Sequence, residues 1–112
     1  LPGVSVAGLE NAIPEKFNLL QNYPNPFNPE TKIEYHLPQP SEVRLVIYDV
    51  RGQIVRELVQ GIKPAGYHDV VWDSRNDAGR KAATGIYIYR IEMSSQEEKK
   101  QFIDVRKMEL MK

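Results

Sequence analysis

The chain has 112 residues, of which 41% are hydrophobic, and its 15 basic and 15 acidic side chains give a formal net charge of zero. This size and composition predict one folded domain with its own core, and the charge balance argues against a general binder of nucleic acid or of anionic membranes. The chain has no cysteine, which excludes disulfides, thiolate metal ligands and a cysteine nucleophile, and no apolar run approaches the roughly 20 residues needed for membrane insertion.

The N-terminal residues are predicted to be a linker. Residues 1–16 are weakly patterned, and the sequence begins with Leu1 and not Met, so we expect a piece of a longer protein in which this linker follows another domain. Residues 17–20, Phe-Asn-Leu-Leu, predict a short first strand or an anchor on the domain edge. The folded module is therefore expected to span residues 17–112.

A proline-rich segment, residues 21–29, precedes the first long strand. Its sequence is Gln-Asn-Tyr-Pro-Asn-Pro-Phe-Asn-Pro. The prolines exclude a helix and a central strand, because each fixes φ and removes a backbone donor. We expect a stiff, extended lead-in, with Tyr23 or Phe27 packed on the domain as an anchor.

Alternating hydrophobic residues predict strands after this segment. In residues 31–37 and 43–48, apolar residues recur at every second position and so share one face, which is typical of half-buried strands. Gly52 predicts a hairpin turn with the glycine in a left-handed conformation. Residues 54–60 have a spacing that also fits a helical turn, but their short length favours a strand.

The second half of the chain continues this pattern. Glycine and proline predict a loop at 61–66, alternation at 68–72 predicts a strand, and a polar run ending in glycine predicts a longer loop at 73–79. Residues 85–93 are largely β-branched and aromatic, which gives the strongest strand prediction in the chain.

A C-terminal hairpin is predicted last. It has a turn at 94–97 and a strand at 100–106, followed by a short mixed tail at 107–112. About seven regularly spaced strands, with frequent turns and no helix, predict an all-β fold, an antiparallel β-sandwich.

The sequence offers no catalytic constellation. His36 and His68 fall at alternating strand positions, where a solvated or strand-edge role is the favoured interpretation, and no nucleophile elbow, zinc-binding helix or phosphate loop occurs. We therefore expect a protein that is not an enzyme and has no cofactor.

The 73–79 loop suggests a calcium site as one alternative. Asp73, Asn76 and Asp77 bring together oxygen side chains as in part of a calcium loop. However, Arg75 interrupts them and the bidentate glutamate is missing, so a turn in which these side chains bond to backbone is favoured.

The aromatic residues suggest a carbohydrate platform as another alternative. Trp72, Tyr87 and Tyr89 could present their rings to a sugar. However, the two tyrosines lie on the face opposite Ile86 and Ile88, and one of these faces must be core. The rings could therefore serve packing or a subunit contact instead.

An ordered series of motifs closely resembles the C-terminal sorting domain (type A) of type IX secretion cargo. Each motif alone is weak, but their order and spacing over residues 17–112 are specific. The motifs are Leu20 to Pro29; Thr31-x-Ile33-x-Tyr35-x-Leu37-Pro38; Val43-x-Leu45-x-Ile47-Tyr48-Asp49-x-x-Gly52-x-x-Val55; Ala65-Gly66-x-His68; Trp72-Asp73; Asn76-Asp77-x-Gly79; and Gly85-Ile86-Tyr87-x-Tyr89.

The resemblance implies an immunoglobulin-like β-sandwich, similar to the immunoglobulin-like part of the flagellar hook-capping protein, joined to an upstream cargo domain. It implies export through the periplasm and outer membrane of a Gram-negative bacterium, recognition by the secretion machinery, removal in many cases by a sortase-like peptidase, and a secreted or surface location. The sorting-signal residues that it implies are Gly85, Ile86, Tyr87, Tyr89, Lys107, Met108, Leu110 and Lys112.

The chain departs from the family pattern in its loops and tail. Ser74 stands where the family usually has glycine, Ala83-Thr84 stands where a serine or alanine pair usually precedes Gly85, and Glu109 lies inside the tail. The expected function is a non-catalytic sorting domain. The alternatives are an accessory carbohydrate- or calcium-binding module and a structural spacer or oligomerisation domain.

Overall fold

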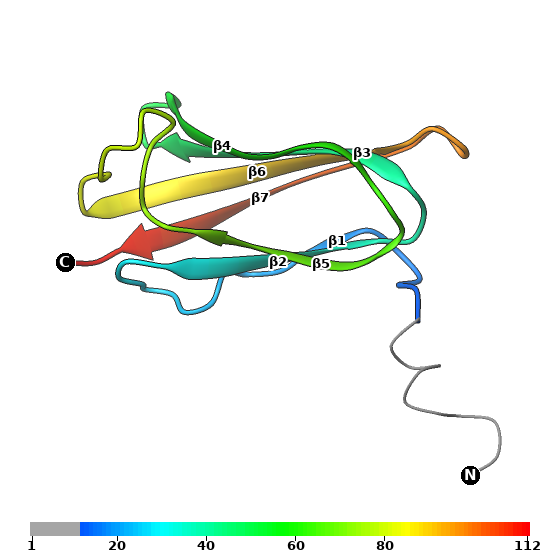
Figure 1. The fold of residues 1–112 in the computed structure, drawn as a ribbon, viewed down its shortest axis with the longest axis horizontal. Helices are drawn as coiled ribbons and strands as arrows, with labels where there is room; N and C mark the ends of the chain where they lie inside the picture. The colour runs from blue at the N-terminus through cyan, green and yellow to red at the C-terminus, as the bar shows by residue number, and fades with distance from the viewer. Residues whose placement is uncertain (1–11) are drawn as a thin grey trace, which may run out of the picture.

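Two antiparallel sheets face each other across the core of the domain (Figure 1). The computed structural model describes residues 12–112, so most of the predicted 1–16 linker lies outside the described residues. The first sheet has the order β1-β2-β5, with β1 at Asn18–Leu19, β2 at Thr31–Leu37 and β5 at Gly66–Trp72. The second has the order β4-β3-β6-β7, with β3 at Ser41–Asp49, β4 at Ile54–Lys63, β6 at Gly85–Ser95 and β7 at Lys100–Leu110.

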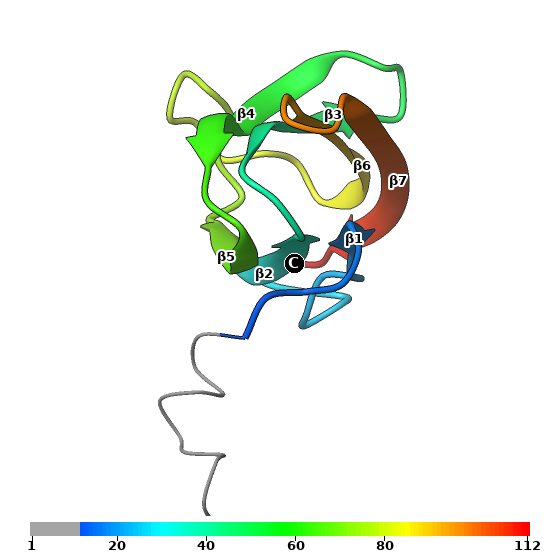
Figure 2. The same cartoon turned by 90° about the vertical axis from the view of Figure 1, so that its right-hand side faces the viewer.

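Alternating residues of both sheets build the core. In β2, Ile33, Tyr35 and Leu37 are buried, as their period of two predicts. Figure 2 shows the two sheets end-on, enclosing the space that these side chains fill. The predicted all-β sandwich of seven strands is therefore confirmed. Residues 12–112 form no helix, and so none that is long and apolar enough to cross a membrane.

The ambiguous 54–60 segment is a strand, and two bulges explain its pattern. The register of β3 with β4 shifts between Leu45 and Val46 and again between Ile47 and Tyr48. Each shift places an extra residue on β4, which interrupts the period of two. Apolar side chains then recur at a spacing that imitates a helix.

The predicted loop at 61–66 is wrong in its extent. Gly61 continues β4 opposite Val43, and the strand runs on to Lys63, so that only Pro64 and Ala65 separate it from β5. β3 offers pairing partners over this whole length, and this pairing outweighs the weak strand preference of glycine.

The C-terminal hairpin is longer than predicted. The turn lies at 96–99 and not at 94–97, and β7 continues to Leu110, so the predicted 107–112 tail is mostly strand. The extension follows from register, because Gly85 pairs with Leu110 and the whole of β6 has a partner in β7.

Candidate functional site

A buried tyrosine of β6 fastens the proline-rich segment to the sandwich. The Tyr89 hydroxyl donates a hydrogen bond to the Leu20 carbonyl at 2.8 Å and accepts one from the Asn22 amide at 2.8 Å. Tyr89 is fully buried, and burial raises the pKa of its hydroxyl to about 12. The hydroxyl therefore remains a neutral donor at ordinary pH.

Asn22 and Thr31 hold the first turn of this segment. Asn22 is buried, and its Nδ2 donates to Thr31 Oγ1 at 2.9 Å and to the Pro24 carbonyl at 3.2 Å. The Thr31 hydroxyl donates to the same carbonyl at 2.8 Å. Within residues 12–112 no buried side-chain nitrogen or oxygen lacks a partner, so the turn is fixed by satisfied polar groups.

Phe27 is the hydrophobic anchor of the segment. It is 2% exposed, and its ring centroid lies 5.8 Å from that of Trp72, which in turn meets Tyr87 edge-on at 5.4 Å. Three sequence motifs thus supply one aromatic cluster in the core. The predicted anchoring role is confirmed for Phe27, whereas Tyr23 is 78% exposed.

The proline-rich segment also covers the free edge of β7 near its end. The Phe27 amide donates to the Glu109 carbonyl at 3.0 Å, and the Phe27 carbonyl accepts from the Met111 amide at 2.8 Å. Asn25 Oδ1 accepts from the Glu109 amide at 3.0 Å. The outward backbone groups at this end of β7 are therefore paired within the chain, which blocks simple strand addition there.

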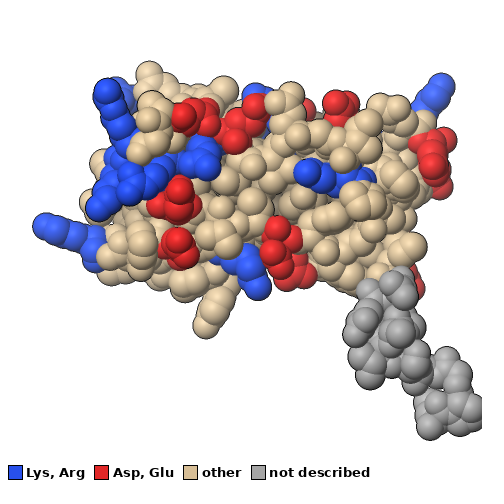
Figure 3. Space-filling view, viewed as in Figure 1, with Lys and Arg blue, Asp and Glu red and all other residues tan. Residues whose placement is uncertain are grey.

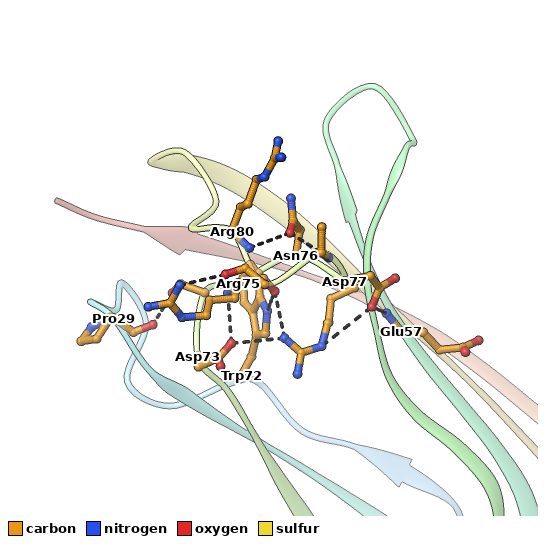
Figure 4. A network of polar contacts seen from close by, with 12 residues as sticks. Pro29, Glu57, Trp72, Asp73, Arg75, Asn76, Asp77 and Arg80 are labelled. Carbon is orange, nitrogen blue, oxygen red and sulfur yellow. Dashed lines mark hydrogen bonds and ion pairs between the residues drawn. The ribbon is translucent and has the colours of Figure 1, made fainter.

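The loop between β5 and β6 is held on the sandwich by a hydrogen bond from the buried side chain of Trp72 (Figure 4). Trp72 Nε1 donates to the Arg75 carbonyl at 2.9 Å. Asp73 Oδ1 accepts from the Arg75 amide at 3.0 Å and pairs with Arg56 of β4 at 3.3 Å. The Trp-Asp motif thus shapes the loop through its side chains.

The oxygens of the alternative calcium site accept hydrogen bonds from backbone donors. Asn76 Oδ1 accepts hydrogen bonds from two amides of the same loop at 3.0 and 2.9 Å. Asp77 Oδ1 accepts from the Glu57 amide of β4 at 3.1 Å. Figure 4 shows both side chains turned toward these nitrogens. The geometry therefore matches the favoured self-bonded turn for Asp73 and Asn76, while Asp77 instead ties the loop to a strand edge.

Ser74 joins this loop to the proline-rich segment. Its backbone φ is +67°, in the left-handed region that glycine adopts without steric cost. The buried side chain donates a hydrogen bond to the Pro29 carbonyl. The departure from glycine therefore introduces backbone strain but adds a link between two motif segments.

A pocket of about 630 Å³ opens where these segments meet at one end of the sandwich. Its walls come from residues 28–30, from the 73–84 loop and from residues 110–112. Figure 3 shows lysine and arginine side chains gathered at this end of the molecule, on the left of the view. We call this cavity the terminal pocket.

The predicted sorting-signal residues come together but divide into three groups by exposure. They lie at the start of β6 and the end of β7, which pair directly, Gly85 with Leu110 and Tyr87 with Met108. The side chains of Tyr87, Tyr89, Met108 and Leu110 are buried, Gly85 and Ile86 are half-buried, and Lys107 and Lys112 are exposed. Lys107 and Lys112 are therefore the side chains of this set that are most open to a partner in the folded domain.

The alternative of a carbohydrate platform is contradicted by the burial of its aromatic rings, which leaves packing as their role. Trp72 and Tyr89 are fully buried and Tyr87 is 7% exposed, so their rings cannot stack on a sugar. The sequence left open which face of residues 85–93 is core, and in the structure the tyrosines lie on the core face.

Two basic residues of the terminal pocket, Arg75 and Lys81, were not predicted as site residues, whereas Lys112 was. Arg75 and Lys81 lie in a polar loop whose pattern predicted only turns. Their position beside the chain end depends on the packing of three segments distant in sequence, which no local pattern carries.

Together these features define a class of protein, an immunoglobulin-like β-sandwich whose last strand is closed by an N-terminal proline-rich segment. The FlgD Ig-like domain family matches residues 27–98, more than half of the chain, and the chain belongs to this family. No curated protein sequence matches it.

Solved structures share the fold. Dimeric latent PorU from Porphyromonas gingivalis has a TM-score of 0.69 and 20% identity, over 90% of this chain and 10% of that one. FlgD from P. aeruginosa has a TM-score of 0.56 and 23% identity, over 71% of this chain and 61% of that one. The chain thus spans less than two thirds of either protein, and identities at this level indicate the fold alone.

Proposed function

We propose that this domain is a non-catalytic sorting domain, read by a secretion machinery that carries an attached protein to the surface of a Gram-negative bacterium. The supporting observation is that several of the resembling motifs, distant from one another in sequence, converge at one end of the sandwich. Four segments meet there: the proline-rich segment, the 73–84 loop, the start of β6 and the end of β7. The domain itself makes and breaks no bond in this function.

The surface to be recognised is a folded one. The tail strand is paired with β6 on one side and with the proline-rich segment on the other. On β7, strand addition by a partner is therefore limited to the earlier part of the free edge, near Ile103 and Val105, which are about half exposed. At the end of β7, exposed side chains such as Lys107 and Lys112 remain accessible.

An export assay tests the proposal without knowledge of the natural cargo. The 112-residue chain is fused behind a reporter that carries an export signal, in a bacterium with type IX secretion, beside the same reporter without the chain. We expect the reporter at the cell surface or in the medium only when the domain is present. Retention of a correctly folded fusion inside the cell would falsify the proposal.

Two charge variants sharpen this assay. The Lys107→Gln, Lys112→Gln variant removes two exposed charges at the end of the sandwich where the motifs meet. The Lys99→Gln, Lys100→Gln variant removes the same amount of charge at the β6–β7 turn, at the other end. We expect the first variant to lower surface delivery and the second to leave it unchanged. The mass of the delivered reporter shows whether a sortase-like peptidase removes the domain.

A further inference from the structure

The terminal pocket carries cations that form no ion pair with an acidic side chain of the described residues, 12–112. Arg75, Lys81 and Lys112 line it, and none of them forms an ion pair within residues 12–112. Of the two carboxylate side chains in the lining, Asp73 pairs with Arg56, which leaves Glu30 as the only lining carboxylate side chain without such a pair in the described chain. The pocket is therefore electrostatically complementary to an acidic ligand.

The same pocket presents apolar surface beside the cations. Pro29, Ala82 and Leu110 contribute to its walls, and Met111 is 50% exposed at its rim. A free inorganic anion would leave this surface unused. A volume of about 630 Å³ falls in the range of ligand sites, roughly 300–1,000 Å³, and accommodates a short stretch of peptide.

The walls of the pocket are already held in place. Ser74 bonds to Pro29, the Arg75 carbonyl accepts from the indole of Trp72, and Arg75 Nη1 donates to the Gly79 carbonyl at 2.9 Å. A pocket built from such fixed contacts loses little conformational entropy when a ligand binds.

We infer that the terminal pocket binds an acidic, extended peptide segment of a partner protein. Carboxylates of this segment meet Arg75 and Lys81, and an apolar side chain of the segment packs beside Met111. The inference rests on the proposed sorting function, because it assigns this segment to the machinery that reads the domain.

A binding experiment with the 112-residue chain tests the pocket directly. The probe is a fluorescein-labelled hexapeptide of alternating glutamate and leucine, compared with the glutamine–leucine version and with inorganic phosphate. We expect saturable binding of the acidic peptide that weakens with salt, and about tenfold weaker binding by the Arg75→Gln, Lys81→Gln variant. The Lys99→Gln, Lys100→Gln variant should bind as the wild type does.

Three results would overturn the inference. They are equal binding of the neutral peptide, unchanged affinity of the pocket variant, and competition by phosphate alone at equal concentration, which would indicate a simple anion site. Lys81→Gln alone, at an exposed position, keeps the test valid if the double variant does not fold.

The export assay separates this inference from the proposed function. If the wild-type fusion is delivered and the Arg75→Gln, Lys81→Gln fusion is delivered equally well, the sorting function stands and the pocket assignment fails. If the wild-type fusion is folded but retained, the sorting function fails, whatever the peptide binding. Loss of both peptide binding and delivery in the pocket variant supports the inference.

Discussion

Single hydroxyl groups join segments of this domain that are far apart in sequence. Tyr89 bonds to backbone groups 67 and 69 residues away, and Ser74 bonds to a carbonyl 45 residues away. The Tyr89 hydroxyl satisfies the amide of the buried Asn22, a group that is costly to leave unpaired. At the scale of the residue, polar side chains therefore hold the proline-rich segment in place.

Removal of the Tyr89 hydroxyl should destabilise the domain. Tyr89→Phe leaves the Leu20 carbonyl and the Asn22 amide without this partner, and we expect a loss of about 1–3 kcal/mol in the free energy of unfolding. Urea denaturation measures the loss. Tyr67→Phe, at a 57% exposed position, is the control and should change little; a loss of equal size there would contradict the argument.

The same hydroxyl should make stability depend on alkaline pH. Its pKa is raised by burial from 10.0 to about 12 in the folded chain, so the unfolded chain releases the proton at lower pH than the native chain does. The contribution of this hydroxyl to the free energy of unfolding is therefore fully present below pH 10. It is lost as the pH rises toward about 12.

Denaturation series on either side of pH 10 check this dependence. The slope should be smaller in Tyr89→Phe but should persist in part, because burial also raises the pKa of Tyr35 and Tyr87. An identical slope in the variant and the wild type would show that Tyr89 does not carry the effect.

Ser74 should show opposed effects of backbone strain and hydrogen bonding. Ser74→Ala keeps the left-handed φ of +67° and loses the bond to Pro29, which should cost about 1 kcal/mol. Ser74→Gly loses the same bond but relieves strain of about 1 kcal/mol, and should be nearly neutral. Denaturation of both variants provides the comparison, and an alanine variant as stable as the glycine variant would refute it.

At the scale of the element, irregular segments cover part of each edge of the four-stranded sheet. The proline-rich segment covers the end of β7, and the 73–79 loop covers the start of β4, where the Asp77 amide donates to the Val55 carbonyl at 2.9 Å. Covered edges cannot pair with other chains. The two best-defined motif segments of the sequence therefore have a shared structural task in protecting this sheet.

The two aromatic residues of the proline-rich segment should differ sharply in how much stability the domain loses when each is replaced by alanine. Phe27→Ala removes a ring packed on Trp72 and should destabilise the domain by about 3–5 kcal/mol. Tyr23→Ala alters a 78% exposed side chain and should cost less than about 0.5 kcal/mol. In hydrogen exchange, the amides of Glu109 and Met111 should lose protection in the first variant only. Protection that survives Phe27→Ala would argue against the edge-covering role.

At the scale of the whole molecule, the two ends of the sandwich differ. The end with the terminal pocket carries the chain end and the 73–84 loop, whereas the opposite end carries the β6–β7 turn (Figure 1). The molecule extends 51 Å along its longest axis, so charges at the two ends can be varied independently, well beyond the screening distance of about 8 Å in physiological salt.

Deletion of residues 107–112 should unfold the domain. It removes the buried side chains of Met108 and Leu110, and each such loss costs about 2–5 kcal/mol in a domain whose total stability is expected at about 5–15 kcal/mol. Circular dichroism and thermal melting should show this loss, while Lys107→Gln, Lys112→Gln keeps the wild-type melting temperature. A deletion variant that melts like the wild type would show that the end of β7 is dispensable for the fold.

Local patterns predicted most of the strands. Ile33, Tyr35 and Leu37 alternate in sequence and in burial, and Gly52 has the left-handed φ of +83° that its turn requires. The extent of β4 past Gly61 was not predictable, because the partner strand decides it. The terminal pocket was not predictable either, since it depends on how two sheets bring residues 28–30, 73–84 and 110–112 together.

The closure of β7 by the proline-rich segment bears on the order in which the chain can fold. The segment leaves the ribosome, or any translocation pore, more than 80 residues before its partner, since Asn25 and Glu109 are 84 residues apart. Until β7 arrives, Phe27 has no strand edge to pair with, and contacts of such long sequence separation form slowly. A chain threaded from its N-terminus would therefore leave this domain incompletely folded until residues 109–111 emerge. The domain would complete its folding only when its own last strand has left the ribosome or the pore.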